Sequence, residues 1–375
     1  MKLTVSADEV RGKDRRIAAF LAERSLGGLM ISGKNNFAWA TCGRSNRVGK
    51  GGEYGVGHLL YTADGRKYLL CDNIEEPRLT QEEQLEEQGF EFVTGPWYSY
   101  DLAAEAMKRT PGGVLAADMP ISGAQLLSPA DGKALRLPLL PTEIERYRWL
   151  GQTASVAMET TARAIEPGMT EHEVGAVLDH FLEDEGIVPW LTLIASDERM
   201  ERYRHPIPTD KTVNRAVMLV TGANAFGLTA SVTRIVHFGS LPHELAKKHD
   251  AVCYVDTVLN TSTAAGLSVA EVFARAQAAY AQTGYGNEWM LHHQGGATGY
   301  TAREYRGKPD SNEVVQASQA FAWNPSITGT KSEDTIIAAA PGGAPEVLTH
   351  HTSHWPGKRI ETPYGTLDRP MILVR

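Results

Sequence analysis

The pattern of apolar and polar residues is clearest near the middle of the chain, where an apolar run and a second segment of strand type flank a short loop. Residues 217–220 are an unbroken apolar run of the kind found in buried strands. Residues 231–238, SVTRIVHF, are typical of a second strand that ends at Gly239, and Gly222 and Gly227 lie between the two segments. Glycine favours turns because it adopts backbone conformations that other residues avoid. The pattern predicts a two-stranded hairpin with both glycines in its turn, around which the rest of the chain is organised.

The first third of the chain alternates between helical and strand patterns. Apolar residues at helical spacing over 7–25 predict a helix, and the residues Ala-Asp-Gly at 63–65 predict the turn of a hairpin. The other elements expected are strands at 29–32, 57–61, 67–71, 90–93 and 114–117, an acidic helix at 75–88 and a helix at 101–108. Alternating helices and strands predict an α/β domain, which we place at residues 1–140.

A second domain, residues 141–375, is expected after a proline-marked linker. Thr142 followed by Glu145 has the spacing of a capping box, which predicts the start of a long helix. A proline-glycine turn should end that helix, and a second capped helix should follow it. The final segment, 350–375, contains three histidines and fits no pattern that we recognise.

Composition narrows the classes of function. The chain has 375 residues and a formal net charge of −8, which argues against nucleic acid or an anionic membrane as a partner. Its three cysteines show no Cys-x-x-Cys spacing, as expected for free thiols in a reducing compartment. No apolar run approaches the roughly 18 residues of a membrane span, and the first residues carry no apolar signal segment. We therefore expect a cytoplasmic protein that acts on a small molecule.

The hairpin carries a sequence motif as well as a hydrophobic pattern. Thr233 lies eleven residues after Gly222 and is followed directly by Arg234. This spacing resembles the hairpin of the pita-bread fold, shared in peptidase family M24 by methionine aminopeptidases, prolidases, aminopeptidase P and creatinase. In that family two aspartates, one before the glycine and one before the threonine, bridge two divalent metal ions. Here Val220 and Ser231 occupy the aspartate positions. The resemblance implies an α+β pita-bread catalytic domain behind the α/β domain, in the creatinase and Xaa-Pro dipeptidase branch.

The other metal-ligand positions of the family are only partly kept. By resemblance, His292 matches the family's histidine ligand, Asn324 stands where the family has a glutamate, and Glu333 matches a glutamate that is retained. Two divalent ions about 3.5–4 Å apart need bridging carboxylates to neutralise their charge. Valine has no donor atom at all, and serine and asparagine are neutral ligands. We therefore expect no metal and no other cofactor at this site.

His205 is the candidate for proton transfer. It is followed by proline in the segment before the hairpin, and it matches the histidine that metal-independent creatinase uses as its acid and base. Imidazole titrates near 6.5, so it can take a proton from water and return it to a leaving nitrogen. We assign His205, His292 and Glu333 to catalysis, with Glu333 pairing with one of the two histidines. The alternative is that His205 simply packs beneath the loop at 206–208.

The predicted substrate pocket is polar rather than acidic. We assign Ser231, Asn324 and His293 to substrate binding, because neutral hydrogen-bonding groups suit a neutral amide, lactam or ureido group. In creatinase-like dimers a loop of one subunit closes the site of the other, and Arg44 and Arg47 lie where that loop is expected. Arginine can hold a carboxylate through two hydrogen bonds. We therefore predict a homodimer with shared active sites, in which these arginines bind substrate, although solvated arginines are the plainer interpretation.

Three functions remain open from the sequence. The first is a metal-independent, creatinase-like hydrolase that cuts a C–N bond in a small polar metabolite. The second is a non-catalytic relative whose pocket binds a ligand or partner. The third is a metallohydrolase of the Xaa-Pro dipeptidase type, with a rearranged site built from His205, His237, His292 and Glu333. The polar groups that still converge on the pocket favour the enzyme.

Overall fold

A computed structural model describes residues 2–375 of the chain. By its internal contacts the chain divides into two compact units. The first comprises Met1–Leu137 with Phe226–Leu228, and the second comprises Pro138–Ala225 with Thr229–Arg375. The predicted boundary at residue 140 falls close to this division.

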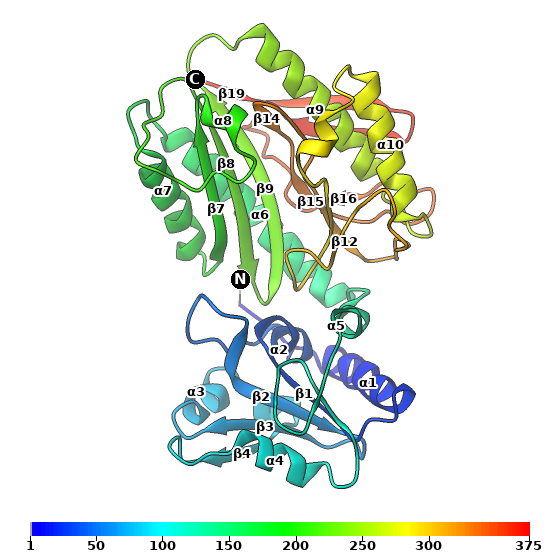
Figure 1. The fold of residues 1–375 in the computed structure, drawn as a ribbon. Helices are drawn as coiled ribbons and strands as arrows, with labels where there is room; N and C mark the ends of the chain where they lie inside the picture. The colour runs from blue at the N-terminus through cyan, green and yellow to red at the C-terminus, as the bar shows by residue number, and fades with distance from the viewer. Residues whose placement is uncertain (1) are drawn as a thin grey trace. The chain divides into compact units, whose positions relative to one another are not determined.

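The first unit is built on a six-stranded sheet with the order β4-β3-β2-β1-β5-β6, in which parallel and antiparallel pairs are mixed (Figure 1). The strands are β1 (Gly28–Gly33), β2 (Tyr54–Thr62), β3 (Lys67–Asp72), β4 (Glu91–Gly95), β5 (Leu115–Ala117) and β6 (Gln125–Leu126). The helices are α1 (Ala7–Glu23), α2 (Lys34–Ala40), α3 (Glu76–Gln81), the 3-10 turn η1 (Leu85–Gln88), α4 (Leu102–Arg109) and α5 (Pro129–Arg136). The predicted α/β class of this region is confirmed.

One prediction in this unit is wrong in its extent. The segment expected as a single acidic helix at 75–88 is broken into α3 and η1. Gln84 lies between them with φ of 52°, a left-handed conformation that ends a helix. The Glu83 carboxylate also accepts a hydrogen bond from the backbone amide of Ser45 at 3.0 Å. This contact with a distant loop fixes the chain where a continuous helix would have carried Glu83 away from it.

The second unit combines a four-stranded sheet, a five-stranded sheet and two short ribbons (Figure 1). The orders are β19-β9-β8-β7 and β11-β10-β12-β15-β16, and the ribbons are β13-β14 and β17-β18. The strands are β7 (Val188–Ser196), β8 (Ala216–Ala225), β9 (Leu228–His237), β10 (Gly295–Thr298), β11 (Tyr305–Arg306), β12 (Ala320–Trp323), β13 (Ser326–Ile327), β14 (Thr330–Lys331), β15 (Asp334–Ile337), β16 (Glu346–Val347), β17 (Gly357–Thr362), β18 (Gly365–Pro370) and β19 (Leu373–Val374). The helices are α6 (Pro141–Ala164), α7 (Glu171–Asp184), α8 (Arg199–Arg202), α9 (His243–Ser262), α10 (Val269–Gln282) and the 3-10 turn η2 (Glu288–Leu291).

The first long helix of this unit starts earlier than predicted. Helix α6 begins at Pro141, and its N-cap is Leu140 rather than Thr142. The Glu143 carboxylate accepts a hydrogen bond from the Leu140 amide at 2.6 Å, which replaces the expected contact of Glu145. Proline suits the first helical position because its fixed φ fits the helix and its missing N–H has no partner there anyway. The capping box that opens the next helix, between Thr170 and Glu173, is present.

The central hairpin forms as β8 and β9, but only one of its two glycines lies in the turn. Phe226 and Gly227 form the turn, both with positive φ, as a two-residue hairpin loop of the tightest type requires. Gly222 lies inside β8 instead, and a Cβ atom there would come within 2.3 Å of the Trp190 side chain. Its small size therefore serves the close packing of β7 against β8.

The final segment, which no sequence pattern placed, completes this unit. Strands β17 and β18 pair with each other, and β19 adds to the central sheet in parallel with β9. The Arg369 side chain is fully buried and forms ion pairs with Asp256 and with Asp334. No helix within residues 2–375 is long and apolar enough to cross a membrane.

Candidate functional site

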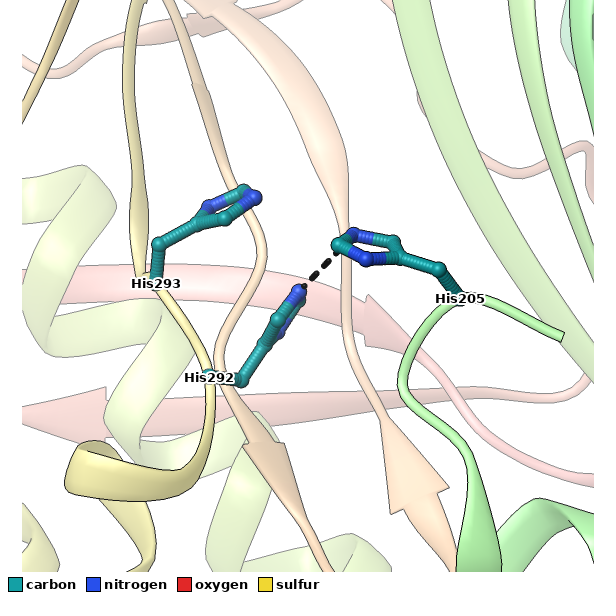
Figure 2. Close-up of side chains that lie close together, drawn as sticks. All are labelled: His205, His292 and His293. Carbon is teal, nitrogen blue, oxygen red and sulfur yellow. Dashed lines mark hydrogen bonds between the residues drawn. The ribbon is translucent and has the colours of Figure 1, made fainter.

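Three histidines from two distant segments come together in the second unit (Figure 2). His205 lies in the loop after α8, whereas His292 and His293 directly follow η2. The Nε2 atoms of His205 and His292 are 3.3 Å apart, within hydrogen-bonding distance. The ring centroids of His292 and His293 are 4.4 Å apart, and those of His205 and His293 are 5.7 Å apart. The structure thus brings together the three histidines that the sequence assigned to the site.

The backbone around these histidines is fixed by a single glutamine. The Gln294 amide donates to the His292 carbonyl at 2.7 Å, and its side-chain oxygen accepts from the Tyr280 hydroxyl at 2.8 Å. The Tyr280 hydroxyl in turn accepts from the backbone amide of Ser326 at 3.0 Å. His205 precedes a proline, which restricts it to extended conformations. The His292 segment is therefore held by buried hydrogen bonds, and His205 by local backbone restriction, rather than by a regular helix or strand.

All three imidazoles are kept neutral at pH 7. Burial, followed by the positive charge of Lys331, lowers the pKa of His292 to about 2. Burial and then the Arg303 guanidinium lower the pKa of His293 to about 4. The pKa of His205 is also lowered, first by burial and then by Lys331. Neutral imidazoles can accept a proton or donate one hydrogen bond, which is the form needed in a general base.

Glu333 does not pair with either catalytic histidine, contrary to the prediction. Its carboxylate accepts a hydrogen bond from the Thr233 hydroxyl at 2.7 Å and forms an ion pair with Lys331 at 2.7 Å. Arg303 lies 3.6 Å from its other oxygen. Burial would raise the pKa of Glu333, but Lys331 and Arg303 outweigh it and hold the pKa below the usual range. A charged lysine and arginine attract a carboxylate more strongly than a neutral imidazole does, which explains the choice of partner.

The other predicted pocket residues lie on the elements around this cluster. Ser231 is on β9, two residues before Thr233 and so on the same face of the strand as Thr233. Asn324 follows β12; it is buried, and its side-chain oxygen has no hydrogen-bond partner among residues 2–375. Val220 is buried in an apolar cluster that also contains Met218 and Ile235. Where the family resemblance expects a bridging carboxylate, this chain has a hydrophobic wall.

Three further predicted residues, Arg44, Arg47 and His237, are not members of the histidine cluster. Arg44 donates to the Gln84 side chain at 2.7 Å within the first unit, where Arg47 also lies. Their role toward a partner subunit stays a prediction. The His237 imidazole is within 3.2 Å of the Gly239 carbonyl through Nδ1, and it is not a member of the histidine cluster.

Sequence reasoning missed the two cations that define the charge of this site. Lys331 lies two residues before Glu333 on a short strand, so the alternation of side chains was a usable signal that the two could meet. Arg303 lies in the loop between β10 and β11, and no motif singles it out. Neither was assigned to the site, because nothing in a single sequence shows that a loop cation turns inward.

The comparisons with known proteins agree with the fold and the motif positions. A model of metallopeptidase family M24 matches residues 145–362, which is more than half of the chain. The chain belongs to this family. The matched region contains every member of the histidine cluster as well as Lys331 and Glu333.

Relatives with curated names are distant. The Xaa-Pro dipeptidase of Lactobacillus helveticus is 23% identical over 219 residues, covering 56% of this chain and 59% of that protein. The Xaa-Pro dipeptidase of Pyrococcus furiosus is 22% identical over 220 residues, covering 56% of this chain and 63% of that protein. The match therefore spans less than two thirds of the length of each of these relatives.

Solved structures resemble the whole chain. An Xaa-Pro dipeptidase from Bacillus anthracis has a TM-score of 0.76 at 19% identity, over 98% of this chain and 100% of that chain. A prolidase from Pyrococcus horikoshii OT3 has a TM-score of 0.76 at 20% identity, over 92% of this chain and 99% of that chain. The N-terminal domain of the FACT complex subunit SPT16 from chickpea has a TM-score of 0.68 at 12% identity, over 93% of this chain and 98% of that chain. These likenesses confirm the predicted α/β domain followed by a pita-bread domain.

The residues present do not fit the two-metal centre that the family resemblance implies. Val220 has no donor atom, and the one retained acid, Glu333, is already neutralised by Lys331 and Arg303. The three histidines offer one nitrogen each, all within 4.8 Å of one another, which is compact enough for one ion after small side-chain rotations. However, His293 accepts a hydrogen bond from the Gly295 amide through Nδ1, and two cations adjoin the cluster. The electrostatics oppose a divalent cation here.

Proposed function

We propose that this protein is a hydrolase that cleaves a C–N bond in a small polar molecule by histidine acid–base chemistry, without the two metal ions of its family. The observation that carries the proposal is the contact of 3.3 Å between the Nε2 atoms of His205 and His292. It lies in a site where the family's bridging carboxylates are replaced by Val220 and Ser231. Membership of a hydrolase family and likeness to Xaa-Pro dipeptidases support the reaction class.

The histidine pair gives His205 a way to hold a proton. Only one of the two facing Nε2 atoms carries hydrogen, and when His205 donates, its Nδ1 keeps a free lone pair. That nitrogen can take a proton from water as the water oxygen attacks the carbonyl carbon, and can pass it to the leaving nitrogen as the C–N bond breaks. His292, whose pKa is about 2, stays neutral and accepts a hydrogen bond from the transient imidazolium. His292 thus positions and stabilises the protonated His205.

The cations of the site can stabilise the oxyanion that forms when water attacks the substrate carbonyl. Attack by water converts the substrate carbonyl into an oxyanion, and fixed positive charge stabilises an oxyanion best where water is excluded. Lys331 is nearly fully buried and has only one carboxylate, Glu333, which it shares with Arg303. The positive charge of Arg303 can serve the developing oxyanion, a role that metal ions fill in two-metal hydrolases.

The decisive variant is His205→Ala. We expect turnover of amide, lactam and ureido test compounds to fall by about 10²–10⁴-fold, the usual contribution of a general acid–base group. His172→Ala, which removes an exposed histidine of α7, is the matched control and should keep full activity. Circular dichroism melting curves would show that both variants fold. Full activity of the His205 variant would exclude the proposed role.

A second candidate is a hydrolase with one metal ion held by the three histidines, acting on Xaa-Pro dipeptides like those named for its relatives. The donor spacing within 4.8 Å favours it, whereas the adjoining Lys331 and Arg303 disfavour it. Activity on Xaa-Pro dipeptides that appears only after addition of a divalent metal would identify this candidate. Ligand binding without turnover of any compound would instead favour a non-catalytic binding protein.

The assembly is also a proposal. A homodimer in which Arg44 or Arg47 reaches the partner's substrate is favoured by the family resemblance and by their position on the loop after α2. Sedimentation velocity of the purified chain would test for the dimer. Arg44→Ala and Arg47→Ala should then raise KM and leave kcat nearly unchanged, because substrate positioning is their expected role.

A further inference from the structure

A pocket opens beside the histidine pair, and its polar lining consists mainly of hydrogen-bond donors. Its walls include Arg204, Met218, His292, Ser326, Thr330 and Lys331, and its inner space is about 10 Å³, room for one water-sized group such as a carboxylate oxygen, with a mouth that opens to solvent. Ser326 on β13 pairs directly with Lys331 on β14, so the two side chains stand at the same point of this short ribbon. No aspartate or glutamate is among the lining residues described in the structure.

Two of these donors have no hydrogen-bond partner within residues 2–375. The Ser326 hydroxyl is buried, with the residue only 2% exposed, and forms no hydrogen bond within residues 2–375. The Arg204 Nε–H is likewise buried without a partner, although its Nη2 donates to Thr328 at 2.9 Å and contacts Glu288 at 3.2 Å. Buried donors without partners cost free energy, and a bound acceptor would remove that cost.

The charges around the pocket do not balance. Lys331 and Arg303 share one carboxylate, Glu333, while Arg204 is matched by Glu288. Arg306 adds a further positive charge close enough to lower the pKa of both His205 and His293. With the three histidines neutral, the site carries net positive charge and has no unpaired acid that could receive a cation.

We propose that this pocket binds a carboxylate of the substrate, seated against Lys331, Ser326 and Arg204, with the scissile C–N bond next to His205. The proposal rests on the proposed function, because it names the substrate of the same site. It implies an anionic acyl compound, such as an N-acyl or N-carbamoyl acid or a lactam acid. A protonated amine or guanidinium group is disfavoured, since Lys331 and Arg204 line the pocket and no aspartate or glutamate among the described lining residues could balance a further cation.

Binding of simple probes tests this without requiring turnover. Ligand-observed NMR would measure the affinity of propanoate, with propylammonium as the probe of opposite charge and similar size. We expect saturable binding of propanoate and none of propylammonium. Lys331→Gln should weaken propanoate binding by about tenfold or more, the value of one charge-assisted hydrogen bond. Lys358→Gln, which removes an exposed lysine paired with Asp250, is the matched control and should bind as the wild type does.

Ser326→Ala keeps the test valid if the lysine variant fails to fold, because it removes only a hydroxyl that has no partner. It should weaken propanoate binding by a smaller factor without loss of stability. Unchanged affinity in both variants, or equal binding of propylammonium, would overturn the proposal. Propanoate binding without turnover of any acyl acid would contradict the proposed hydrolase function but support the anion pocket. Turnover that does not depend on a substrate carboxylate would refute the pocket alone.

Discussion

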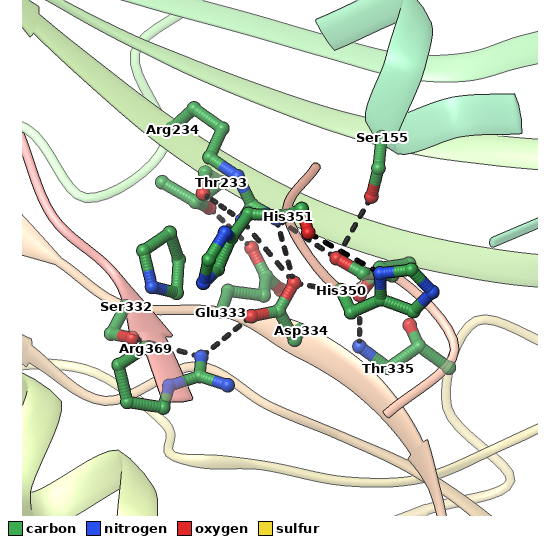
Figure 3. Close-up of polar contacts among 12 residues, drawn as sticks. Ser155, Thr233, Arg234, Ser332, Glu333, Asp334, Thr335, His350, His351 and Arg369 are labelled. Carbon is green, nitrogen blue, oxygen red and sulfur yellow. Dashed lines mark hydrogen bonds and ion pairs between the residues drawn. The ribbon is translucent and has the colours of Figure 1, made fainter. Parts of the chain in front are cut away.

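Two neighbouring acids, Glu333 and Asp334, belong to two different charged clusters of the same unit. The Asp334 carboxylate lies between the guanidinium groups of Arg234, at 3.2 Å, and Arg369, at 2.6 Å (Figure 3). The Glu333 carboxylate is held by Lys331 and the Thr233 hydroxyl. Successive side chains in an extended chain point to opposite sides, so one backbone segment contributes to both clusters.

The two clusters differ in charge balance and in access. In the first, Asp334 and Asp256 are matched by Arg234 and Arg369, and all four side chains are buried. In the second, the cations outnumber the single acid, and His205 is exposed to solvent. A closed cluster with balanced charge can serve stability but has no place for a ligand. An open cluster with excess charge is poorly suited to stability and well suited to binding an anion.

The largest effect should come from breaking the balanced cluster. Arg369→Met leaves Asp256 without its cation and weakens the balance of Asp334, and we expect it to lower the free energy of unfolding by about 3–5 kcal/mol. Urea denaturation would measure the change. Arg359→Met, at an exposed arginine of β17, is the control and should change stability little. A similar small effect at Arg369 would contradict the assignment of this cluster to stability.

Changing Glu333, the acid of the second cluster, should lower stability by a smaller amount and should strengthen propanoate binding. Glu333→Gln removes the one carboxylate that offsets Lys331 and Arg303, and the expected loss of stability is about 1–3 kcal/mol. Because the site becomes more positive, propanoate should bind more tightly. Asp334→Asn should destabilise the protein without tightening propanoate binding. If both variants gave the same binding, the two clusters would not be separate in function.

The smallest effect expected is a shift in the pH profile of turnover. The pKa of His205 is lowered, so His205 is neutral above that pKa and becomes protonated as the pH falls through it. The base is then lost, and kcat/KM should fall on the acid side with a midpoint below the ordinary 6.5. The charged groups that act on His205 are Lys331, Glu333, Arg306 and Arg303. Lys331→Gln should therefore move the midpoint upward, and an unmoved midpoint would show that His205 is not the titrating base.

The sequence allowed the fold to be predicted because the motif residues are local. The hairpin, the capping box at Thr170 and the retained glycines each depend on residues close together in the chain. The histidines come from two segments far apart in the chain, and His205 and His292 were placed by resemblance to a family pattern. The predictions failed where a distant contact decides the structure, as at Glu83, which is held by the amide of Ser45.

The charge of the site could not be predicted for the same reason. Lys331 is only two residues from Glu333, so that ion pair had a local signal, whereas the approach of Arg303 and of the Thr233 hydroxyl to Glu333 depends on how distant segments meet, which no local pattern encodes. The final segment was unplaced because β19 pairs with a strand more than a hundred residues earlier in the chain. The burial of the charged Arg369 side chain is favourable only because folding brings it next to Asp256 and Asp334, which are distant in the sequence.

We propose that this site has exchanged the metal chemistry of its family for a neutral histidine pair in a positive pocket. The most direct test is elemental analysis of the purified protein after dialysis against manganese, iron, cobalt or zinc. We predict metal well below one equivalent, and turnover of acyl acids that a chelator does not reduce. One equivalent of metal that resists dialysis in the wild type and is lost in His292→Ala would contradict the claim.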